Sequence, residues 1–168
     1  MVSKSQLRTK YKNIRKTLDI NAKSKILTEK IRKSEIYKNA EHVLIYYPLK
    51  YEINLLELLN DNKKFYLPKV NGLDIDVCPY SNELELSEYN IKEPCTNPVK
   101  PEVLDLVIVP AIAVDSDNNR LGYGKGYYDR FLAKYPDIKT VTLIPKELLT
   151  KSLPQDIFDI KIQTVLSA

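Results

Sequence analysis

The spacing of apolar residues predicts two helices in the first part of the chain. Over residues 4–18, apolar side chains recur every three or four positions and basic side chains fill the opposite face. This period is typical of an amphipathic helix that packs one face on a core. Ile26, Leu27 and Ile31 have the same spacing and predict a second helix. Asn21 is the expected N-cap of that helix.

Beyond these helices, short apolar runs alternate with helical patterns. Residues 104–115 form the most apolar run and predict a central strand, and residues 42–48 predict another buried strand. Strands separated by helices predict an α/β fold with a mostly parallel central sheet and helices on both of its faces. Further strands are expected at 63–68, 73–80, 140–144 and 161–167, helices at 53–62 and 126–135, and an irregular crossing at 81–103.

The organisation of the chain is simple, because no internal repeat, linker or low-complexity segment interrupts it. We therefore expect residues 1–168 to form a single domain in which the basic N-terminal helices, within residues 4–33, pack on the α/β core. No apolar run approaches the ~20 residues of a membrane span, and no signal-peptide pattern opens the chain. We expect a cytoplasmic protein with no membrane partner. No exposed stripe predicts a dimer, so a monomer is the default expectation.

Charge is distributed unevenly along the chain. The 26 lysines and arginines exceed the 22 aspartates and glutamates, for a net charge of +4. Residues 1–33 alone contain eleven basic residues and two acidic ones. This segment favours an anionic partner that docks near it, although a solvated helix face explains the same charge. Charge alone leaves both interpretations open.

Few side chains of the chain suit nucleophilic or acid–base catalysis. Cys78 and Cys95 are the only cysteines, and their spacing matches no metal-binding signature, so two reduced thiols are expected. The single histidine, His42, precedes an apolar run and is expected at the end of a strand. Catalysis that depends on histidine is therefore not predicted. Any metal ion would need carboxylate ligands, which suit magnesium.

Three of the four glycines of the chain lie in RLGYGKGYYDRF, residues 120–131. This stretch follows the predicted central strand and precedes a predicted helix, which is where ligands bind in open α/β sheets. Glycines there let backbone amides turn toward an anion, and a helix N-terminus favours negative charge. Lys125 and Arg120 add positive charge. The stretch predicts a phosphate site, although Tyr127 stands where a P-loop or a dinucleotide fingerprint needs another residue.

Asp129 adds an acidic group beside the predicted phosphate site. An unpaired carboxylate would repel a phosphate, so a magnesium ion between the two groups is the simplest explanation of their proximity. The loop and the acid together predict a site for a magnesium-bound phosphate compound.

The extended motif RLGYGKGYYDRFL closely resembles the signature of the 5-formyltetrahydrofolate cyclo-ligases, also called methenyltetrahydrofolate synthetases. This resemblance implies that 5-formyltetrahydrofolate is converted to 5,10-methenyltetrahydrofolate with ATP and Mg²⁺. The formyl oxygen would attack the γ-phosphate to give an imidate phosphate, and N10 would then close the ring with release of phosphate and ADP. Other stretches match the family in order and spacing: KSQLR (4–8), YYPLKYEIN (46–54), YLPKV (66–70), YNIKEP (89–94) and DLVIVPAIAVD (105–115).

The resemblance also implies a role for individual residues. Arg120 and Lys125 would neutralise charge on the transferred phosphoryl group. Asp129 and Asp159 would bind magnesium, with Asp156 as the alternative to Asp159. The residues expected at ATP are Lys4, Arg8, Arg120, Leu121, Gly122, Tyr123, Gly124, Lys125, Gly126, Tyr127 and Tyr128. The residues expected at the folate are Tyr47, Glu52, Tyr89, Tyr123 and Tyr127.

Other interpretations of the same residues remain open. The basic N-terminal segment and the twelve tyrosines are compatible with a nucleic-acid-binding module, but no RNA-binding signature is present, so we expect no nucleic-acid partner. A sugar-phosphate or acyl-transfer enzyme could use the same phosphate loop without ATP. Tyr47 and Tyr89 could belong to the core, and Lys4 could be a solvated residue at a helix end.

Overall fold

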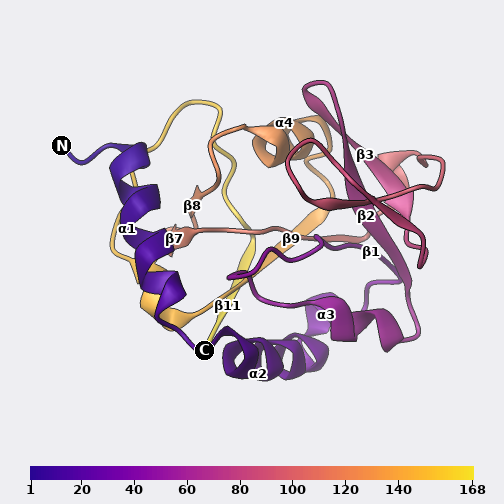
Figure 1. Cartoon of the computed structure of the whole chain (residues 1–168), viewed down its shortest axis with the longest axis horizontal. Helices are drawn as coiled ribbons and strands as arrows, with labels where there is room; N and C mark the ends of the chain where they lie inside the picture. Colours follow the sequence, from indigo (N-terminus) through magenta and orange to yellow (C-terminus); the bar gives the residue numbers. More distant parts are fainter.

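The structure, a computed structural model, describes all residues 1–168 and is built around a sheet of six strands in the order β11-β9-β6-β1-β2-β3 (Figure 1). Each neighbouring pair in this sheet is parallel except β2 and β3, which form an antiparallel hairpin. The prediction of a mostly parallel α/β sheet is confirmed. The strands are β1 (His42–Leu44), β2 (Lys64–Asn71), β3 (Asp74–Pro79), β6 (Leu106–Ile108), β9 (Lys139–Ile144) and β11 (Thr164–Ser167).

Helices cover both faces of the main sheet. Successive side chains of β1 and of the residue after it point to opposite faces of the sheet, as in any strand. Val43 and Ile45 lie in a core cluster with residues of α2 (Ile20–Lys33) and α3 (Glu35–Lys38). Leu44 lies in a separate cluster with residues of α4 (Tyr127–Lys134). The expected helical layer on each face is therefore present.

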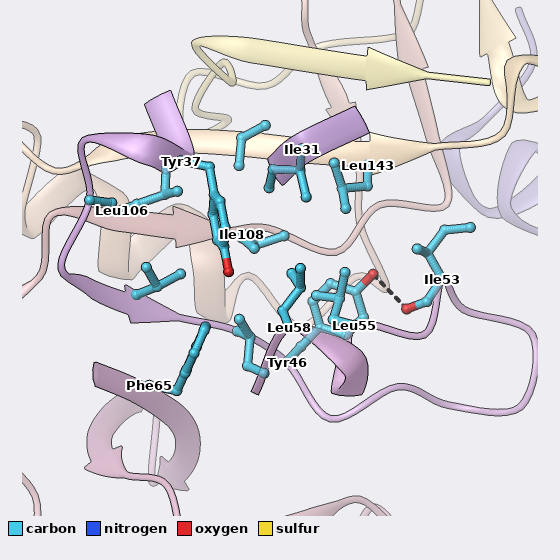
Figure 2. Packing of buried hydrophobic residues seen from close by; sticks show 14 of the residues in the cluster. Ile31, Tyr37, Tyr46, Ile53, Leu55, Leu58, Phe65, Leu106, Ile108 and Leu143 are labelled. Atoms are coloured by element: carbon cyan, nitrogen blue, oxygen red, sulfur yellow. Dashed lines mark hydrogen bonds between the residues drawn. The ribbon is translucent and has the colours of Figure 1, made fainter. Parts of the chain in front are cut away.

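The cluster under α2 and α3 is the larger of the two and contains few polar atoms. It joins apolar side chains of both helices to those of β1, β2, β6 and β9 (Figure 2). Tyr46 is buried in it, and its hydroxyl donates a hydrogen bond of 3.1 Å to the carbonyl of Ile53 (Figure 2). This bond satisfies the buried phenol and ties the segment after β1 to the loop that holds Glu52.

The N-terminal helix α1 (Lys4–Lys16) packs on a second, smaller sheet. The helix starts with a capping box, in which Gln6 N donates to Ser3 Oγ and Ser3 N donates to Gln6 Oε1. Tyr11 is buried against the small sheet. The strands of this sheet lie in the order β10-β7-β8 and span Leu149–Thr150, Ala113–Asp115 and Arg120–Leu121.

The single strand expected at 104–115 is wrong, because the chain forms two strands there. β6 ends at Ile108 in the main sheet, and β7 begins at Ala113 in the small sheet. Pro110 lies between them and has no N–H group to donate to a sheet. The break moves the chain from one sheet to the other, and Pro110 then lines the cavity described below.

Several other boundaries also differ from those expected. The cap of α2 is Asp19, whose carboxylate accepts a 3.0 Å hydrogen bond from Ala22 N, and Asn21 lies inside the helix. The expected helix at 53–62 is a 3₁₀ helix, Leu56–Asn60, and the strand from His42 is only three residues long. The crossing at 81–103 contains a short hairpin of β4 (Leu84–Leu86) and β5 (Lys92–Pro94), followed by the 3₁₀ helix Pro101–Val103. A third 3₁₀ helix spans Lys146–Leu148.

Both cysteines are free thiols; Cys78 is buried in β3 and Cys95 is exposed. None of the helices combines the length and the apolar character that crossing a lipid bilayer would require.

Candidate active site

A cavity of about 940 Å³ opens beyond the carboxyl ends of β1 and β6, where ligands bind in open α/β sheets. Its walls come from α1, the glycine loop, α4, the β2–β3 hairpin and the segment before β11. Every residue to which the sequence assigns a site role lines this one cavity, although the individual roles stay predictions. These residues are Lys4, Arg8, Tyr47, Glu52, Tyr89, residues 120–129 and Asp159.

The glycine loop takes a path along one wall that side chains would obstruct. Gly124 and Gly126 have φ angles of +98° and +72°, a region that favours glycine. A Cβ atom on Gly122 would lie 2.6 Å from the guanidinium of Arg120, so its backbone passes close to that side chain. Gly126 is the N-cap of α4 and offers no side-chain cap. The first N–H groups of this helix are therefore left to a ligand or water.

Two arginines are fixed beside the loop. Arg8 Nε donates a hydrogen bond of 2.7 Å to the carbonyl of Gly122. Arg120 Nη1 donates to the carbonyl of Pro110 at 2.9 Å, and its side chain is only 5% exposed. Arg120 Nε is buried without a hydrogen-bond partner. Lys125, at the tip of the loop, is exposed and forms no ion pair. Positive charge thus surrounds the loop on its cavity side.

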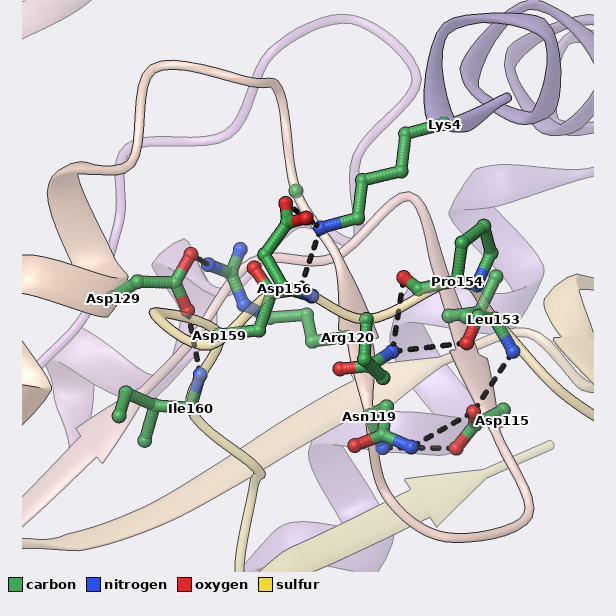
Figure 3. Close-up of polar contacts among 12 residues, drawn as sticks. Lys4, Asp115, Asn119, Arg120, Asp129, Leu153, Pro154, Asp156, Asp159 and Ile160 are labelled. Carbon is green, nitrogen blue, oxygen red and sulfur yellow. Dashed lines mark hydrogen bonds and ion pairs between the residues drawn. The ribbon is translucent and has the colours of Figure 1, made fainter.

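Three aspartates line the cavity near its basic residues, and two of them contact Lys4 at the N-terminus of α1. Lys4 Nζ contacts Asp156 Oδ2 at 2.7 Å and Asp159 Oδ2 at 2.5 Å (Figure 3). Burial of Lys4 opposes its charge, but the two carboxylates outweigh this effect and raise its pKa. Asp129 Oδ2 lies 3.5 Å from Arg120 Nη2. Lys4 is therefore not a solvated helix end.

The aspartates fit a metal ion only if other ligands complete its shell. No group of three or more acidic, histidine or cysteine side chains is arranged around a common point. Asp129 and Asp159 nevertheless offer the hard carboxylate oxygens that Mg²⁺ prefers, and Mg²⁺ is usually held by one or two carboxylates with phosphate oxygens and water. Asp159 is the more enclosed alternative, with 17% of its side chain exposed against 67% for Asp156.

A buried carboxylate occupies the opposite end of the cavity. Glu52 is 8% exposed; its Oε1 accepts from Leu49 N at 2.8 Å and its Oε2 accepts from Tyr123 Oη at 2.9 Å. Burial raises the pKa of Glu52, while these two hydrogen bonds and the charge of Arg15 act in the opposite direction. Arg15 Nη1 and Nη2 contact Tyr123 Oη at 3.0 and 2.8 Å.

The sequence did not predict two polar residues, namely Glu93, which lines the cavity, and Arg15, which contacts Tyr123 from behind the cavity wall. Arg15 lies seven residues after Arg8 on α1, which puts both on one helix face, and this spacing could have identified it. Glu93 is 7% exposed, lines the cavity and accepts a 2.7 Å hydrogen bond from Val70 N. It lies in β5, within the segment expected to be irregular.

Aromatic rings form the wall between the two ends. Tyr89 and Tyr127 meet edge to face with their centroids 6.3 Å apart, and their hydroxyls are 3.2 Å apart. Tyr47 is half-buried, and Lys92 Nζ lies 5.4 Å from the centroid of its ring. His42, the only histidine, contacts Tyr66 Oη and does not line the cavity. The cavity is thus suited to hold and neutralise an anion rather than to supply a histidine base.

Comparison with known proteins gives a consistent result. The model of the 5-formyltetrahydrofolate cyclo-ligase family matches residues 1–168. The 5-formyltetrahydrofolate cyclo-ligase of Mus musculus is 30% identical over 164 residues, which cover 85% of this chain and 81% of the mouse protein. The protein of the same name from Haemophilus influenzae is 25% identical over 185 residues, covering 97% and 96% of the two chains.

A solved structure extends the similarity to the fold. The NMR structure of Aquifex aeolicus 5,10-methenyltetrahydrofolate synthetase matches with a TM-score of 0.85 and 31% identity, covering 98% of this chain and 89% of that chain. The family resemblance that the glycine motif indicated is confirmed along the whole sequence. This chain belongs to the 5-formyltetrahydrofolate cyclo-ligase family.

Proposed function

We propose that this protein converts 5-formyltetrahydrofolate to 5,10-methenyltetrahydrofolate and that each turnover converts one ATP to ADP and phosphate, with the formyl oxygen transferred to the phosphate. The observation that carries the proposal is the composition of the cavity. One end combines a glycine loop with fixed cations, and the other combines aromatic rings with a buried carboxylate. These surroundings suit a triphosphate and a pterin, and membership of the 5-formyltetrahydrofolate cyclo-ligase family supports a formylated folate as the second substrate.

The reaction proceeds in two steps that need no protein nucleophile. The formyl oxygen attacks the γ-phosphorus, the bond to ADP breaks, and an imidate phosphate forms on the folate. N10 then attacks the formyl carbon, the carbon–oxygen bond to phosphate breaks, and the N10 proton leaves to solvent. The phosphate released contains the former formyl oxygen. The protein contributes alignment of the two substrates and neutralisation of charge.

Basic and acidic residues at and near the glycine loop bind the phosphates and the metal. Arg8, Arg120 and Lys4 hold the phosphates, together with the first N–H groups of α4. Lys125 swings from the exposed tip of the loop to the transferred phosphoryl group. Asp129 and Asp159 would hold Mg²⁺, which would neutralise phosphate charge. When ATP binds, Lys4 would exchange its aspartate partners for phosphate oxygens and leave these carboxylates free.

Aromatic and acidic residues hold the folate. Tyr47, Tyr89 and Tyr127 pack against its rings, and Glu52 accepts hydrogen bonds from the donor-rich edge of the pterin. Tyr123 touches both substrates, because it lies in the glycine loop and bonds to Glu52. Lys4 and Arg8 line the cavity and Arg15 contacts Tyr123 of the glycine loop, which supports a small anionic ligand over nucleic acid. We propose a cytoplasmic monomer.

The test is a direct assay of the pure protein. Mixed with 5-formyltetrahydrofolate and Mg-ATP, it should form the methenyl product, which is followed by its near-ultraviolet absorbance, with one ADP per turn. The two-step route also predicts that ¹⁸O placed in the formyl group appears in the released phosphate. No absorbance change with folded protein would disprove the function. Turnover without ATP would instead favour an acyl-transfer enzyme, and unlabelled phosphate would disprove the intermediate alone.

A further inference from the structure

A short relay of side chains joins α1 to the carboxylate at the folate end of the cavity. Arg15 is 5% exposed and does not line the cavity. Its two terminal nitrogens approach Tyr123 Oη at 3.0 and 2.8 Å, and that hydroxyl reaches Glu52 Oε2 at 2.9 Å. Neither Arg15 nor Glu52 forms a direct ion pair, so Tyr123 is the only bridge between the two charges.

The chemistry of the phenol fixes the direction of this relay. A tyrosine hydroxyl has one hydrogen to donate and two lone pairs that accept. Both guanidinium nitrogens of Arg15 are donors only, and they occupy the accepting side of Tyr123 Oη. The hydroxyl hydrogen is therefore left for Glu52. Arg15 thus polarises the phenol and makes it a better donor to the carboxylate.

The same contacts leave Glu52 an acceptor on both oxygens. Oε1 receives the Leu49 N–H and Oε2 receives the Tyr123 hydroxyl, and both hydrogen bonds favour the ionised carboxylate over the neutral acid. The other ionisable groups near Glu52 are the phenols of Tyr46 and Tyr128, which are neutral, and their burial raises their pKa values further. Arg15 is the one cation among these neighbours. Without it, a buried carboxylate here would lack its compensating charge.

We propose that Arg15 is a positioning residue that acts through Tyr123 to keep Glu52 ionised and correctly oriented for the folate, although Arg15 touches neither substrate. The inference rests on the proposed function, because it assigns Glu52 to the folate. It also gives α1 a role at both ends of the cavity. Lys4 and Arg8 serve the phosphate end, and Arg15 serves the folate end.

The test compares Arg15→Met and Arg15→Lys with Lys16→Met, an exposed charge on the same helix. We measure kcat/KM for 5-formyltetrahydrofolate as a function of pH, the KM for ATP, and thermal unfolding. Arg15→Met should lower kcat/KM for the folate about tenfold to a hundredfold, the range for losing a charge-assisted hydrogen bond, and leave the KM for ATP nearly unchanged. Arg15→Lys should restore part of the loss, and Lys16→Met should match the wild type.

The pH profile separates a positioning role from a structural one. Arg15 lowers the pKa of Glu52, so its removal should move the acid limb of the folate profile to higher pH. The proposal is wrong if Arg15→Met has the same kinetics as Lys16→Met. It is also wrong if Arg15→Met impairs kcat/KM for the folate and the KM for ATP to the same extent while the acid limb of the pH profile stays in place.

A double-mutant cycle with Glu52→Gln tests the path of the effect. If Arg15 acts through Glu52, Arg15→Met should cost little further folate efficiency once Glu52 is neutral. A full additional loss would overturn the relay. A wild-type protein that fails to convert the folate would disprove the proposed function itself, and the inference with it. An active wild type with an indifferent Arg15→Met variant would disprove only the inference.

Discussion

The carboxylate of Asp129 accepts a hydrogen bond of 3.1 Å from the backbone N–H of Ile160, the residue that follows Asp159 (Figure 3). This contact joins the first turn of α4 to the segment before β11, across 31 positions of sequence. It brings two carboxylates that are distant in the chain to the same end of the cavity. This backbone contact is thus one of the interactions that set the relative position of the predicted magnesium ligands.

Replacing Asp129 by Asn should remove activity without unfolding the protein. The amide oxygen of Asn can still accept the Ile160 N–H, so the contact survives while the negative charge is lost. We expect at least about tenfold lower activity at limiting Mg²⁺, partly recovered as Mg²⁺ is raised, since a neutral ligand binds the ion less strongly. The measurement is turnover against Mg²⁺ concentration. Asp137→Asn, at an exposed site outside the cavity, is the control, and full activity of Asp129→Asn at low Mg²⁺ would contradict the assignment.

Asp156 and Asp159 form a matched pair for identifying the second metal ligand. Both contact Lys4, but Asp159 is largely enclosed and Asp156 is exposed. We expect Asp159→Asn to raise the Mg²⁺ concentration needed for half-maximal activity by about tenfold, and Asp156→Asn to leave it within about twofold of the wild type. The reverse order would assign the metal to Asp156. Equal small effects would show that both residues serve Lys4 alone.

Gly126 and Gly72 offer a comparison that separates backbone strain from loss of the site. Both have positive φ, +72° and +63°, so alanine at either position should cost about 1–2 kcal/mol of unfolding free energy. A Cβ atom at Gly72 meets nothing within 4 Å, whereas at Gly126 it would lie 2.6 Å from Arg130 Nη1. We expect Gly126→Ala to raise the KM for ATP severalfold and Gly72→Ala to leave it unchanged. Denaturant unfolding and ATP kinetics check both; equal KM values would rule out a role of this loop in binding phosphate.

The residues that line the cavity were predicted from the sequence more accurately than the boundaries of the strands beside it. Gly124 and Gly126 have positive φ, a conformation that glycine favours. The local sequence was therefore sufficient to predict a turn at the glycine motif. The break at Pro110 was missed because the apolar run continues through it, and only the switch between sheets reveals it. Arg15 was missed for another reason. The spacing from Arg8 placed it on the same helix face, but its partner Tyr123 lies 108 positions away, so its contact could not be predicted from local pattern.

Asp115 gives the clearest expectation for stability against pH. It is 4% exposed, and its oxygens accept from the backbone N–H groups of Asn119 and Leu153 and from the Asn119 amide (Figure 3). The backbone N–H of Asp117 donates a fourth hydrogen bond. Burial alone would raise the pKa of this carboxyl, but the four hydrogen bonds outweigh it and lower the pKa below its ordinary value. The charged form is thus the one that the fold favours.

The sign of the pH effect follows from that lowered pKa. A carboxyl with a lower pKa in the folded state contributes stability that is fully present above its unfolded pKa, about 4, and is lost as the pH falls through the folded value. Asp115→Asn should therefore unfold more easily at neutral pH, by about 2 kcal/mol, because the loop 115–119 and Leu153 lose charge-assisted hydrogen bonds. Its free energy of unfolding should also fall less steeply than that of the wild type below about pH 4. Denaturant titrations across that range, with Asp137→Asn as the exposed control, test both statements; parallel pH curves for the wild type and Asp115→Asn would show that Asp115 is not held ionised by the fold.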